Sequence, residues 1–380
     1  MAKRLPVTVI TGFLGAGKTT VLRHLLTRGG QRLAVMVNEF GSVGLDGDLI
    51  RSCGFCPEEE VDGRLVELNN GCLCCTVQDD FLPTMETLLE RADQLDGIVV
   101  ETSGLALPRP LLQALDWPAI RSRVHVNGVV TLVDGEALAA GSPVADAEAL
   151  ERQRAEDPSL DHLTAIDDLF EDQLQAADLV LISRADCLDA SAMAEVQGRI
   201  KDKVRPGTAL LPVSQGQVET SVVLGLEHKP TPQEAHTHID NDHHDHDHDH
   251  HDHHDHHDHH DHSHVDMVGS NVRVEGAFDR QALEQLLPSL VSNHQVVRLK
   301  GRVWLPSKTL PLQIQMVGPR LNSWFEAAPS HAWRPDQGCG ADLVVLALNE
   351  AAAPALESGL QRLVQATPAK ASPAAATPES

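Results

Sequence analysis

The stretch Gly12-Phe13-Leu14-Gly15-Ala16-Gly17-Lys18-Thr19 decides the fold of this 380-residue chain. It fits the pattern G-x-x-x-x-G-K-[S/T], in which a glycine-rich loop wraps phosphate groups between a strand and a helix. Residues 5–10 form a short apolar run, and the segment from 18 to about 27 is apolar at helical spacing. A glycine-rich turn could match the pattern by chance, but these flanking segments favour a P-loop that opens an α/β domain.

Each residue type in this loop has a role in holding phosphate. Three glycines permit the backbone angles that turn several N–H groups toward one anion. The loop residues that we expect to contact phosphate are Gly12, Gly15, Ala16 and Gly17. We expect the Lys18 ammonium to reach the β- and γ-phosphates, and the Thr19 hydroxyl to bind Mg²⁺. The N-terminus of the following helix adds partial positive charge. The loop therefore predicts a site for a nucleoside triphosphate with Mg²⁺.

A second apolar run supplies the other half of this site. Residues 98–100 are apolar and end at Glu101, which could hold a Mg²⁺-bound water opposite Thr19. The alternative is a solvated carboxylate at the end of a strand. Gly104 could approach the γ-phosphate through its backbone N–H. We take Lys18 and Glu101 as the candidate catalytic residues.

The sequence Ser183-Arg184-Ala185-Asp186 follows a strand candidate at 179–182, where GTPases carry [N/T]-K-x-D. A carboxylate there accepts hydrogen bonds from N1–H and N2–H₂ of guanine, which adenine does not offer in that geometry. Asp186 keeps this chemistry, but Ser183 and Arg184 replace the usual Asn and Lys. Arg184 can still stack on the base plane, although its planar fork is not equivalent to an ammonium. Guanine is favoured over adenine.

Three cysteines lie between the two halves of the phosphate site, at Cys72, Cys74 and Cys75. Thiolates bind Zn²⁺, Co²⁺ and Cu⁺, and several in one turn can share an ion. Cys72 and Cys74 would point the same way in an extended segment, whereas Cys75 joins them only if the backbone turns. Glu39 or a water could complete the site. The alternative is three buried, inert cysteines.

The rest of the chain predicts the fold class. Strand candidates at 33–37, 98–100, 126–133, 179–182 and 209–213 alternate with helical stretches such as 81–92 and 167–176. This alternation predicts a P-loop NTPase domain with a mostly parallel sheet flanked by helices over 1–227. The order β-α-β-β-β-α after about 270 predicts a small C-terminal α+β domain over 270–366. Residues 367–380, rich in Ala, Pro, Ser and Thr, predict a disordered tail.

The formal net charge of −25 argues against nucleic acid or an anionic membrane as the main partner. No apolar run approaches the ~20 residues that a membrane helix needs. The seven cysteines are odd in number and clustered, which suits thiolate chemistry in a reducing compartment. We therefore expect a soluble, cytoplasmic protein.

Residues 236–264 contain sixteen His and nine Asp among twenty-nine residues. Such a segment cannot bury enough apolar surface to offset its ordering entropy, so residues 228–269 predict a linker that is disordered without a ligand. Its imidazoles and carboxylates should hold several divalent ions loosely, as a buffer or a feeder of metal. The alternative is a polar spacer.

Taken together, these motifs resemble the CobW family of P-loop GTPases, which are proposed metallochaperones. The resemblance rests on the P-loop, Gly71-Cys72-Leu73-Cys74-Cys75, Glu101-Thr102-Ser103-Gly104, the modified Asp186 motif and the His-rich linker. It covers about 5–227 strongly, and 271–350 through segments such as Arg298–Trp304. The residues that it implies for phosphate and Mg²⁺ are Gly15, Gly17, Lys18, Thr19 and Thr20.

The resemblance also implies a metal cargo. It assigns Glu39 and Glu101 to sensing the γ-phosphate, and the three cysteines to binding the transported metal. The implied cargo is Co²⁺, delivered to an acceptor such as the cobalt chelatase of cobalamin biosynthesis. The departure at Ser183 and Arg184 bears on nucleotide affinity more than on the fold.

The leading hypothesis is a GTP-hydrolysing metallochaperone in which Mg²⁺–GTP tightens metal binding at the cysteines. A second hypothesis keeps this mechanism with Zn²⁺ as the cargo, because a tetrahedral thiolate site accepts either ion. A third is a metal-storage or sensing protein in which the nucleotide is only a structural ligand.

Overall fold

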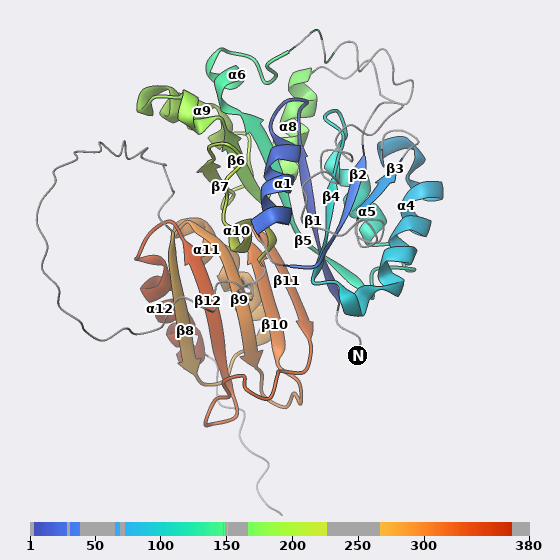
Figure 1. Cartoon of the computed structure of the whole chain (residues 1–380). Helices are drawn as coiled ribbons and strands as arrows, with labels where there is room; N and C mark the ends of the chain where they lie inside the picture. Colours follow the sequence, from blue (N-terminus) through green and yellow to red (C-terminus); the bar gives the residue numbers. More distant parts are fainter. Residues whose placement is uncertain are drawn as a thin grey trace, which may run out of the picture.

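The computed structural model describes residues 4–28, 31–38, 65–68, 73–146, 148, 150, 166–225 and 267–366, which form two sheets with their helices (Figure 1). The elements of the N-terminal part are β1 (Leu5–Gly12), α1 (Lys18–Arg28), β2 (Leu33–Asn38), β3 (Leu65–Leu68), α4 (Leu73–Glu90), β4 (Gly97–Glu101), α5 (Pro108–Leu115), β5 (Val124–Asp134), α6 (Gly135–Ala139), α8 (Ile166–Ala176), β6 (Leu179–Ser183), α9 (Ala190–Lys201), β7 (Ala209–Pro212) and α10 (Thr220–Leu224). The His/Asp-rich tract at 236–264 and the tail at 367–380 lie outside the described residues.

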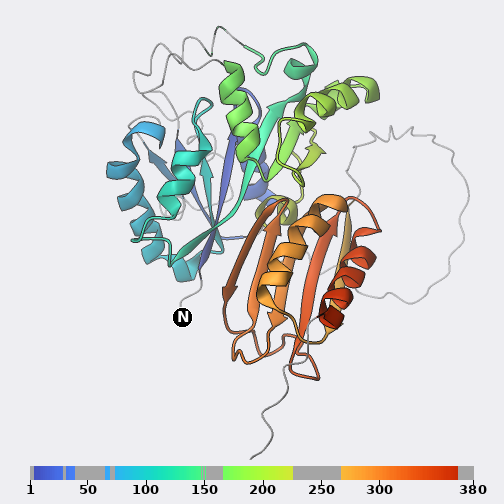
Figure 2. The ribbon, with the colours of Figure 1, turned by 180° about the vertical axis from the view of Figure 1, so that it is seen from behind.

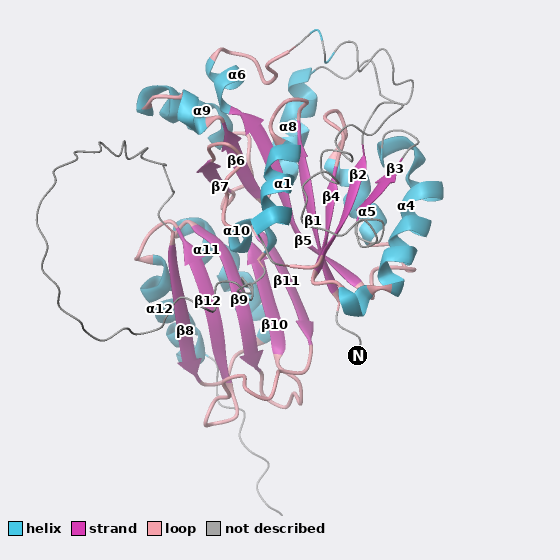
Figure 3. Ribbon diagram, in the orientation of Figure 1, coloured by secondary structure: helices cyan, strands magenta, loops and turns pink. Residues whose placement is uncertain are grey.

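The first sheet has the order β3-β2-β4-β1-β5-β6-β7, and each neighbouring pair is parallel (Figure 3). A parallel sheet is covered on both faces, so its strands are apolar on both sides. In β4, Val99 packs in one cluster with Leu22 of α1, whereas Ile98 and Val100 pack in another with Met85 of α4. The predicted α/β class is confirmed.

The C-terminal part contains β8 (Val268–Glu275), α11 (Arg280–Asn293), β9 (Val296–Trp304), β10 (Leu312–Val317), β11 (Arg320–Phe325), β12 (Gly340–Ala347) and α12 (Ala352–Ala366). Its sheet is antiparallel, in the order β11-β10-β9-β12-β8. Figure 2 shows α11 and α12 side by side on one face of this sheet. Their core joins Leu287 and Leu356 to Leu299 and Leu343. The predicted α+β class is confirmed.

The sequence missed two strands, β3 and β11. The segment Arg320–Phe325 has no alternation of apolar and polar residues, and all six are half-buried. Two of its polar side chains, Arg320 and Asn322, contact the first domain, so their partial burial leaves no apolar signature. The C-terminal domain therefore has four strands after α11, one more than the predicted order.

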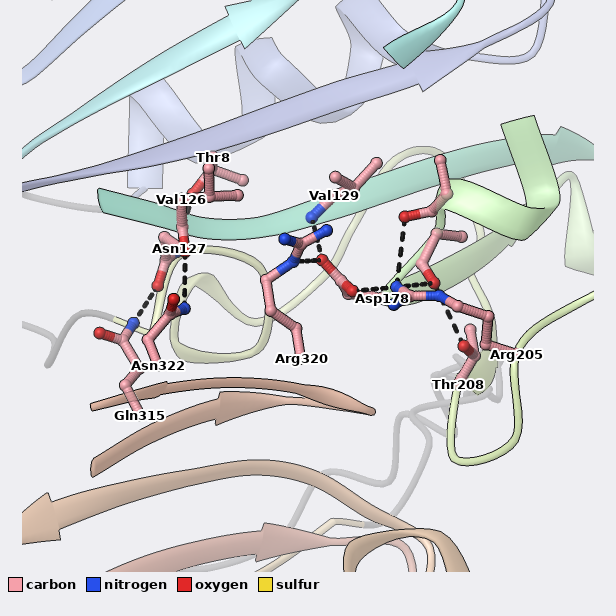
Figure 4. Close-up of polar contacts among 12 residues, drawn as sticks. Thr8, Val126, Asn127, Val129, Asp178, Arg205, Thr208, Gln315, Arg320 and Asn322 are labelled. Atoms are coloured by element: carbon pink, nitrogen blue, oxygen red, sulfur yellow. Dashed lines mark hydrogen bonds and ion pairs between the residues drawn. The ribbon is translucent and has the colours of Figure 1, made fainter. Parts of the chain in front are cut away.

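Polar contacts join the two sheets along β5 (Figure 4). The buried carboxylate of Asp178 accepts a hydrogen bond from the Val129 backbone N–H at 2.8 Å, and it pairs with both Arg205 and Arg320. Asn322 of β11 donates to the carbonyl oxygen of Val126 at 2.9 Å. One face of the C-terminal sheet is thus docked on the nucleotide-binding part of the chain.

The main chains also approach closely at this seam. Gly318, in the turn between β10 and β11, has a φ of 47°. A Cβ atom there would lie 2.4 Å from the carbonyl oxygen of Asp178 and 3.0 Å from that of Gly207. Only glycine satisfies both the left-handed backbone and this spacing. Among the described residues, no helix is long and apolar enough to span a membrane.

Candidate functional site

The P-loop is built where β1 meets α1. Gly12 ends the strand with a φ of 138°, and a Cβ atom there would lie 2.3 Å from the carbonyl oxygen of Leu132 on β5. Lys18 begins α1, and its Nζ donates to the carbonyl oxygens of Gly12 at 2.9 Å and Phe13 at 3.1 Å. The ammonium therefore lies over the loop, within reach of an anion held by the loop N–H groups.

Thr19 and Glu101 meet across the site. The Thr19 hydroxyl donates to Glu101 Oε1 at 3.1 Å, because β1 and β4 are parallel neighbours with Ile10 opposite Glu101. Glu101 is 3% exposed, so it is not the solvated strand end that the sequence left as an alternative. A hydroxyl and a carboxylate are oxygen donors of the kind that Mg²⁺ takes beside nucleotide phosphates. The donor set fits that ion.

The segment after β4 is held against the P-loop. A Cβ atom at Gly104 would lie 2.6 Å from the backbone nitrogen of Leu14. Gln173 of α8, which is fully buried, donates through Nε2 to the carbonyl oxygens of Gly104 at 3.2 Å and Ala106 at 3.3 Å. The sequence did not single out Gln173, since nothing local marks a contact between residues about seventy positions apart.

Residues 183–186, which we call the base-reading segment after their predicted role, start where β6 ends. The Ser183 hydroxyl donates to the carbonyl oxygen of Val133 at 3.2 Å, and a Cβ atom on Gly17 would lie 3.7 Å from Ser183 Cβ. Ser183 therefore packs beside the P-loop. Asp186 is exposed in the short turn Ala185–Cys187, where its carboxylate is open to a base.

Arg184 has acidic partners that the sequence did not identify. Its backbone is left-handed, with a φ of 54°. Its Nη1 lies 3.3 Å from Asp134 Oδ2 and 3.2 Å from Glu136 Oε2, at the start of α6. Asp134 is buried, and its other oxygen caps α6 by accepting from the Ala137 N–H at 3.0 Å. The Arg184 side chain, 44% exposed, is thus oriented by two carboxylates.

The loop between β7 and α10 also borders the site, and the sequence did not point to it. The Ala185 N–H donates to the carbonyl oxygen of Val213 at 3.2 Å, which ties this loop to the base-reading segment. Gly216 has a φ of 71°, and a Cβ atom there would lie 2.8 Å from Thr20 Cγ2. The loop therefore contacts both the phosphate side and the base side.

The cysteine motif begins α4. Cys74 and Cys75 lie in the first turn of this helix, so of the two backbone geometries that the sequence left open, extended or turned, these two residues have the turned one; Cys72 and Glu39 lie outside the described residues. Asn38, the last residue of β2, pairs with Leu68 at the end of β3. Within the described ranges, no three His, Cys, Asp or Glu side chains form a metal-binding group.

Comparison with known proteins agrees with these features. Residues 6–212 match the family model of the CobW/HypB/UreG nucleotide-binding domain, and residues 267–364 match that of the C-terminal domain of cobalamin synthesis protein CobW.

Two relatives are each named "Zinc chaperone CobW". One, from Pseudomonas aeruginosa, is 47% identical over 348 residues, which cover 90% of this chain and 87% of the relative. The other, from Sinorhizobium sp, is 41% identical over 364 residues, which cover 95% of this chain and 98% of the relative. "Zinc-regulated GTPase metalloprotein activator 1" of Schizosaccharomyces pombe is 44% identical over 134 residues, which cover 34% of this chain and 32% of that protein. Because both domains of the family match this chain in the same order, and the described residues include the P-loop with Thr19 and Glu101, the chain belongs to the CobW family of P-loop GTPases.

Proposed function

We propose that this GTPase is a zinc metallochaperone: it binds Zn²⁺ at Cys72, Cys74 and Cys75 under the control of Mg²⁺–GTP and releases it to an acceptor metalloenzyme. The sequence resemblance had implied Co²⁺ and a cobalt chelatase. Thiolate donors accept both ions, and the Irving–Williams order favours zinc at equal availability. Both extensive relatives are named as zinc chaperones, so zinc is the better proposal.

One observation carries this proposal, which is the register of β3, β2 and β4. Val37 of β2 is opposite Glu101 of β4, and Asn38 is opposite Leu68 of β3. Glu39 follows Asn38 directly, and Cys72 follows Leu68 by four residues. Because the carboxyl ends of parallel strands lie at one edge of the sheet, the last residues of β2, β3 and β4 are neighbours there, and the segments that lead to Glu39 and to Cys72 both start from this edge.

The described residues support a division of labour at the phosphates. Lys18 is positioned to neutralise the β- and γ-phosphates, and Thr19 and Glu101 would hold Mg²⁺, which supplies charge stabilisation when bound. Gly104, fixed by Gln173, offers its N–H to the γ-phosphate. Asp186 and the oriented Arg184 favour guanine. GTP would thereby arrange the segment at Glu39, and hydrolysis would release it.

The remaining expectations stay proposals of the same kind. The P-loop domain over 1–227 would be joined by a linker over 228–269 to the C-terminal domain over 270–366. The His/Asp-rich tract in that linker would feed zinc to the cysteines, and the acceptor would be a metal-requiring enzyme.

The test measures zinc affinity by competition with a chromophoric chelator, for nucleotide-free protein, with GDP, and with a non-hydrolysable GTP analogue. We expect one tight ion whose affinity rises 5- to 150-fold with the GTP analogue, the range of typical coupling energies. Replacing the three cysteines by Ser should abolish that ion. Equal affinities in all three nucleotide states would reject the mechanism.

Two control proteins sharpen this test. Deleting residues 236–264 should remove loosely held ions and keep the tight one, whereas loss of all zinc with the tract would indicate a storage protein. The Lys18→Ala variant should bind zinc without any response to GTP. A Co²⁺ titration of the GTP-analogue form, read by the cobalt–thiolate absorption band and displaced by Zn²⁺, compares the two cargoes.

A further inference from the structure

The helix α10 is held between the two domains. It has five residues, and four of them are buried: Thr220, Val222, Val223 and Leu224. A helix this short leaves its last carbonyl oxygens without partners inside the helix. Buried carbonyls need hydrogen bonds from elsewhere, so the groups that supply them help to hold α10 in place, beside the packing of its apolar side chains in the core.

The C-terminal domain supplies two of those hydrogen bonds through one side chain. Arg298 of β9 is 6% exposed, and its guanidinium donates from Nε to the carbonyl oxygen of Val222 and from Nη2 to that of Val223. A cation at a helix C-terminus also complements the helix dipole. Arg298 thus caps a helix that belongs to the other domain.

Asn127 of β5 completes the cap. Its Nδ2 donates to the carbonyl oxygen of Leu224 at 2.8 Å and to the Thr8 hydroxyl at 2.8 Å. Its Oδ1 accepts from Arg298 Nη1 at 3.4 Å and from Gln315 of β10. Three successive carbonyls at the end of α10 are therefore bound by a network that includes both sheets.

The other end of α10 leads to the nucleotide site. The loop from Val213 to Glu219 precedes α10, and its Gly216 lies against the Thr20 side chain and close to the Val21 nitrogen, at the start of the P-loop helix. The same loop accepts the Ala185 N–H of the base-reading segment. A displacement of α10 would carry this loop away from both.

We propose that Arg298 is a positioning residue through which the C-terminal domain sets the nucleotide affinity of the P-loop site, by capping α10 and thereby fixing the loop at 213–219. The coupling is reciprocal by linkage, so nucleotide binding also tightens the contact of β9 with α10. A partner that engages the C-terminal domain and disturbs this cap would loosen the nucleotide. The inference concerns nucleotide affinity and does not depend on which metal is carried.

The experiment measures the dissociation rate and Kd of a fluorescent GDP analogue, together with kcat and KM for GTP, in the full chain. Arg298→Met keeps an unbranched apolar side chain and removes the donors, so we expect Kd and KM to rise at least fivefold with kcat within twofold. Arg298→Lys keeps the positive charge but cannot donate to both carbonyl oxygens with one planar group, so its Kd should lie between those of the wild type and Arg298→Met. Arg320→Met is the matched control, since it breaks a contact at the same seam without touching α10, and should change Kd less than twofold.

Equal increases in Kd for Arg298→Met and Arg320→Met would overturn the proposal, because any loosening of the domain contact would then be enough to weaken nucleotide binding. An unchanged Kd in folded Arg298→Met would overturn it as well. Amide hydrogen exchange in the wild-type chain gives a second test if that variant does not fold. Saturating GDP should slow exchange at 214–225 and 296–300 but not in α12 at 352–366. Unchanged exchange at 220–225 and 296–300 on adding GDP would also reject the coupling.

Discussion

Asp178 and Arg320 form an ion pair that joins the two domains, with a carboxylate that is completely buried. Asp178 precedes β6 of the first sheet, and Arg320 begins β11 of the second. Arg205 and the Val129 N–H bind the same carboxylate. Three donors from distant parts of the chain therefore meet at one carboxylate, and Arg320 brings the second sheet to it, so we interpret this cluster as the polar centre of the domain contact.

Asp178→Asn should destabilise the protein by about 3 kcal/mol, because it leaves two guanidinium groups facing a neutral amide in a buried site. Urea unfolding followed by circular dichroism measures the effect. Asp342→Asn is the control, since Asp342 pairs at 2.8 Å with Arg273, which is half exposed; there the change should stay below about 1 kcal/mol. Equal losses in the two variants would contradict a special role for Asp178.

Gln173→Met should lower kcat for GTP hydrolysis about tenfold while leaving the affinity for GDP unchanged. The reason is that Gln173 holds the Gly104 carbonyl oxygen, and we propose that the Gly104 N–H binds the γ-phosphate that GDP lacks; one such donor is typically worth 10²–10³ when lost entirely. Phosphate release and GDP titration measure the two quantities.

The matched control for Gln173 lies on the same helix. Gln175 is exposed and donates to the carbonyl oxygen of Lys203 at 2.8 Å, away from the site. Gln175→Met should therefore keep full activity. If Gln173→Met weakened GDP as much as it slowed hydrolysis, its role would be general support of the domain and not the placement of Gly104.

Asp186→Asn should weaken GDP binding about tenfold or more, since hydrogen bonds to charged groups are worth about 1.5–3 kcal/mol. ADP binding, which does not use this carboxylate, should not change. Competition against a fluorescent nucleotide measures both affinities. Asp202→Asn, an exposed position after α9, serves as the control; a parallel loss of ADP affinity in Asp186→Asn would remove the case for guanine recognition.

Arg298 gives a pH dependence with a definite sign. Burial lowers the pKa of Arg298 to about 9, although the charge of Asp178 opposes that shift. Above pH 9 the unfolded chain binds more protons at this residue than the folded protein does, so this residue makes stability rise with pH there. Below pH 9 the group is protonated in both states and contributes no slope.

The difference in free energy of unfolding between wild type and Arg298→Met isolates this contribution. We expect it to be constant from pH 7 to 8. Above about pH 9 it should move in favour of the wild type, with a slope approaching ~1.4 kcal/mol per pH unit. A difference that changes below pH 8, or stays flat up to pH 10, would be incompatible with the lowered pKa.

The phosphate half of the site was predictable because its signals are local. The P-loop and its flanks adjoin in sequence, and Glu101 ends an apolar run, so the Thr19–Glu101 contact follows once the two strands are parallel neighbours. The supporting residues were not predictable in this way. Gln173 acts on partners brought close by the packing of α8, and Asp134 meets Arg184 through the register of β5 and β6; a single Gln or Asp carries no pattern.

The buried polar residues of the domain contact were not predictable for a different reason. The sequence points to Arg298 only as part of the segment Arg298–Trp304, because nothing local in a strand tells which domain will cover a charged residue. The face it occupies is covered by the other domain. Cys72 and Glu39, which we propose as metal ligands, lie outside the described residues, so both their role and their geometry stay predictions.

Gly318 shows how the angle between the two sheets is determined. At this point the backbone of one domain rests on the backbone of the other, with no side chain between them. The contact at this point therefore depends on the two backbones and on the absence of a side chain at position 318. A single methyl group at position 318 would clash with the carbonyl oxygen of Asp178, so it would push the two sheets apart at this point without altering any charged residue of the chain.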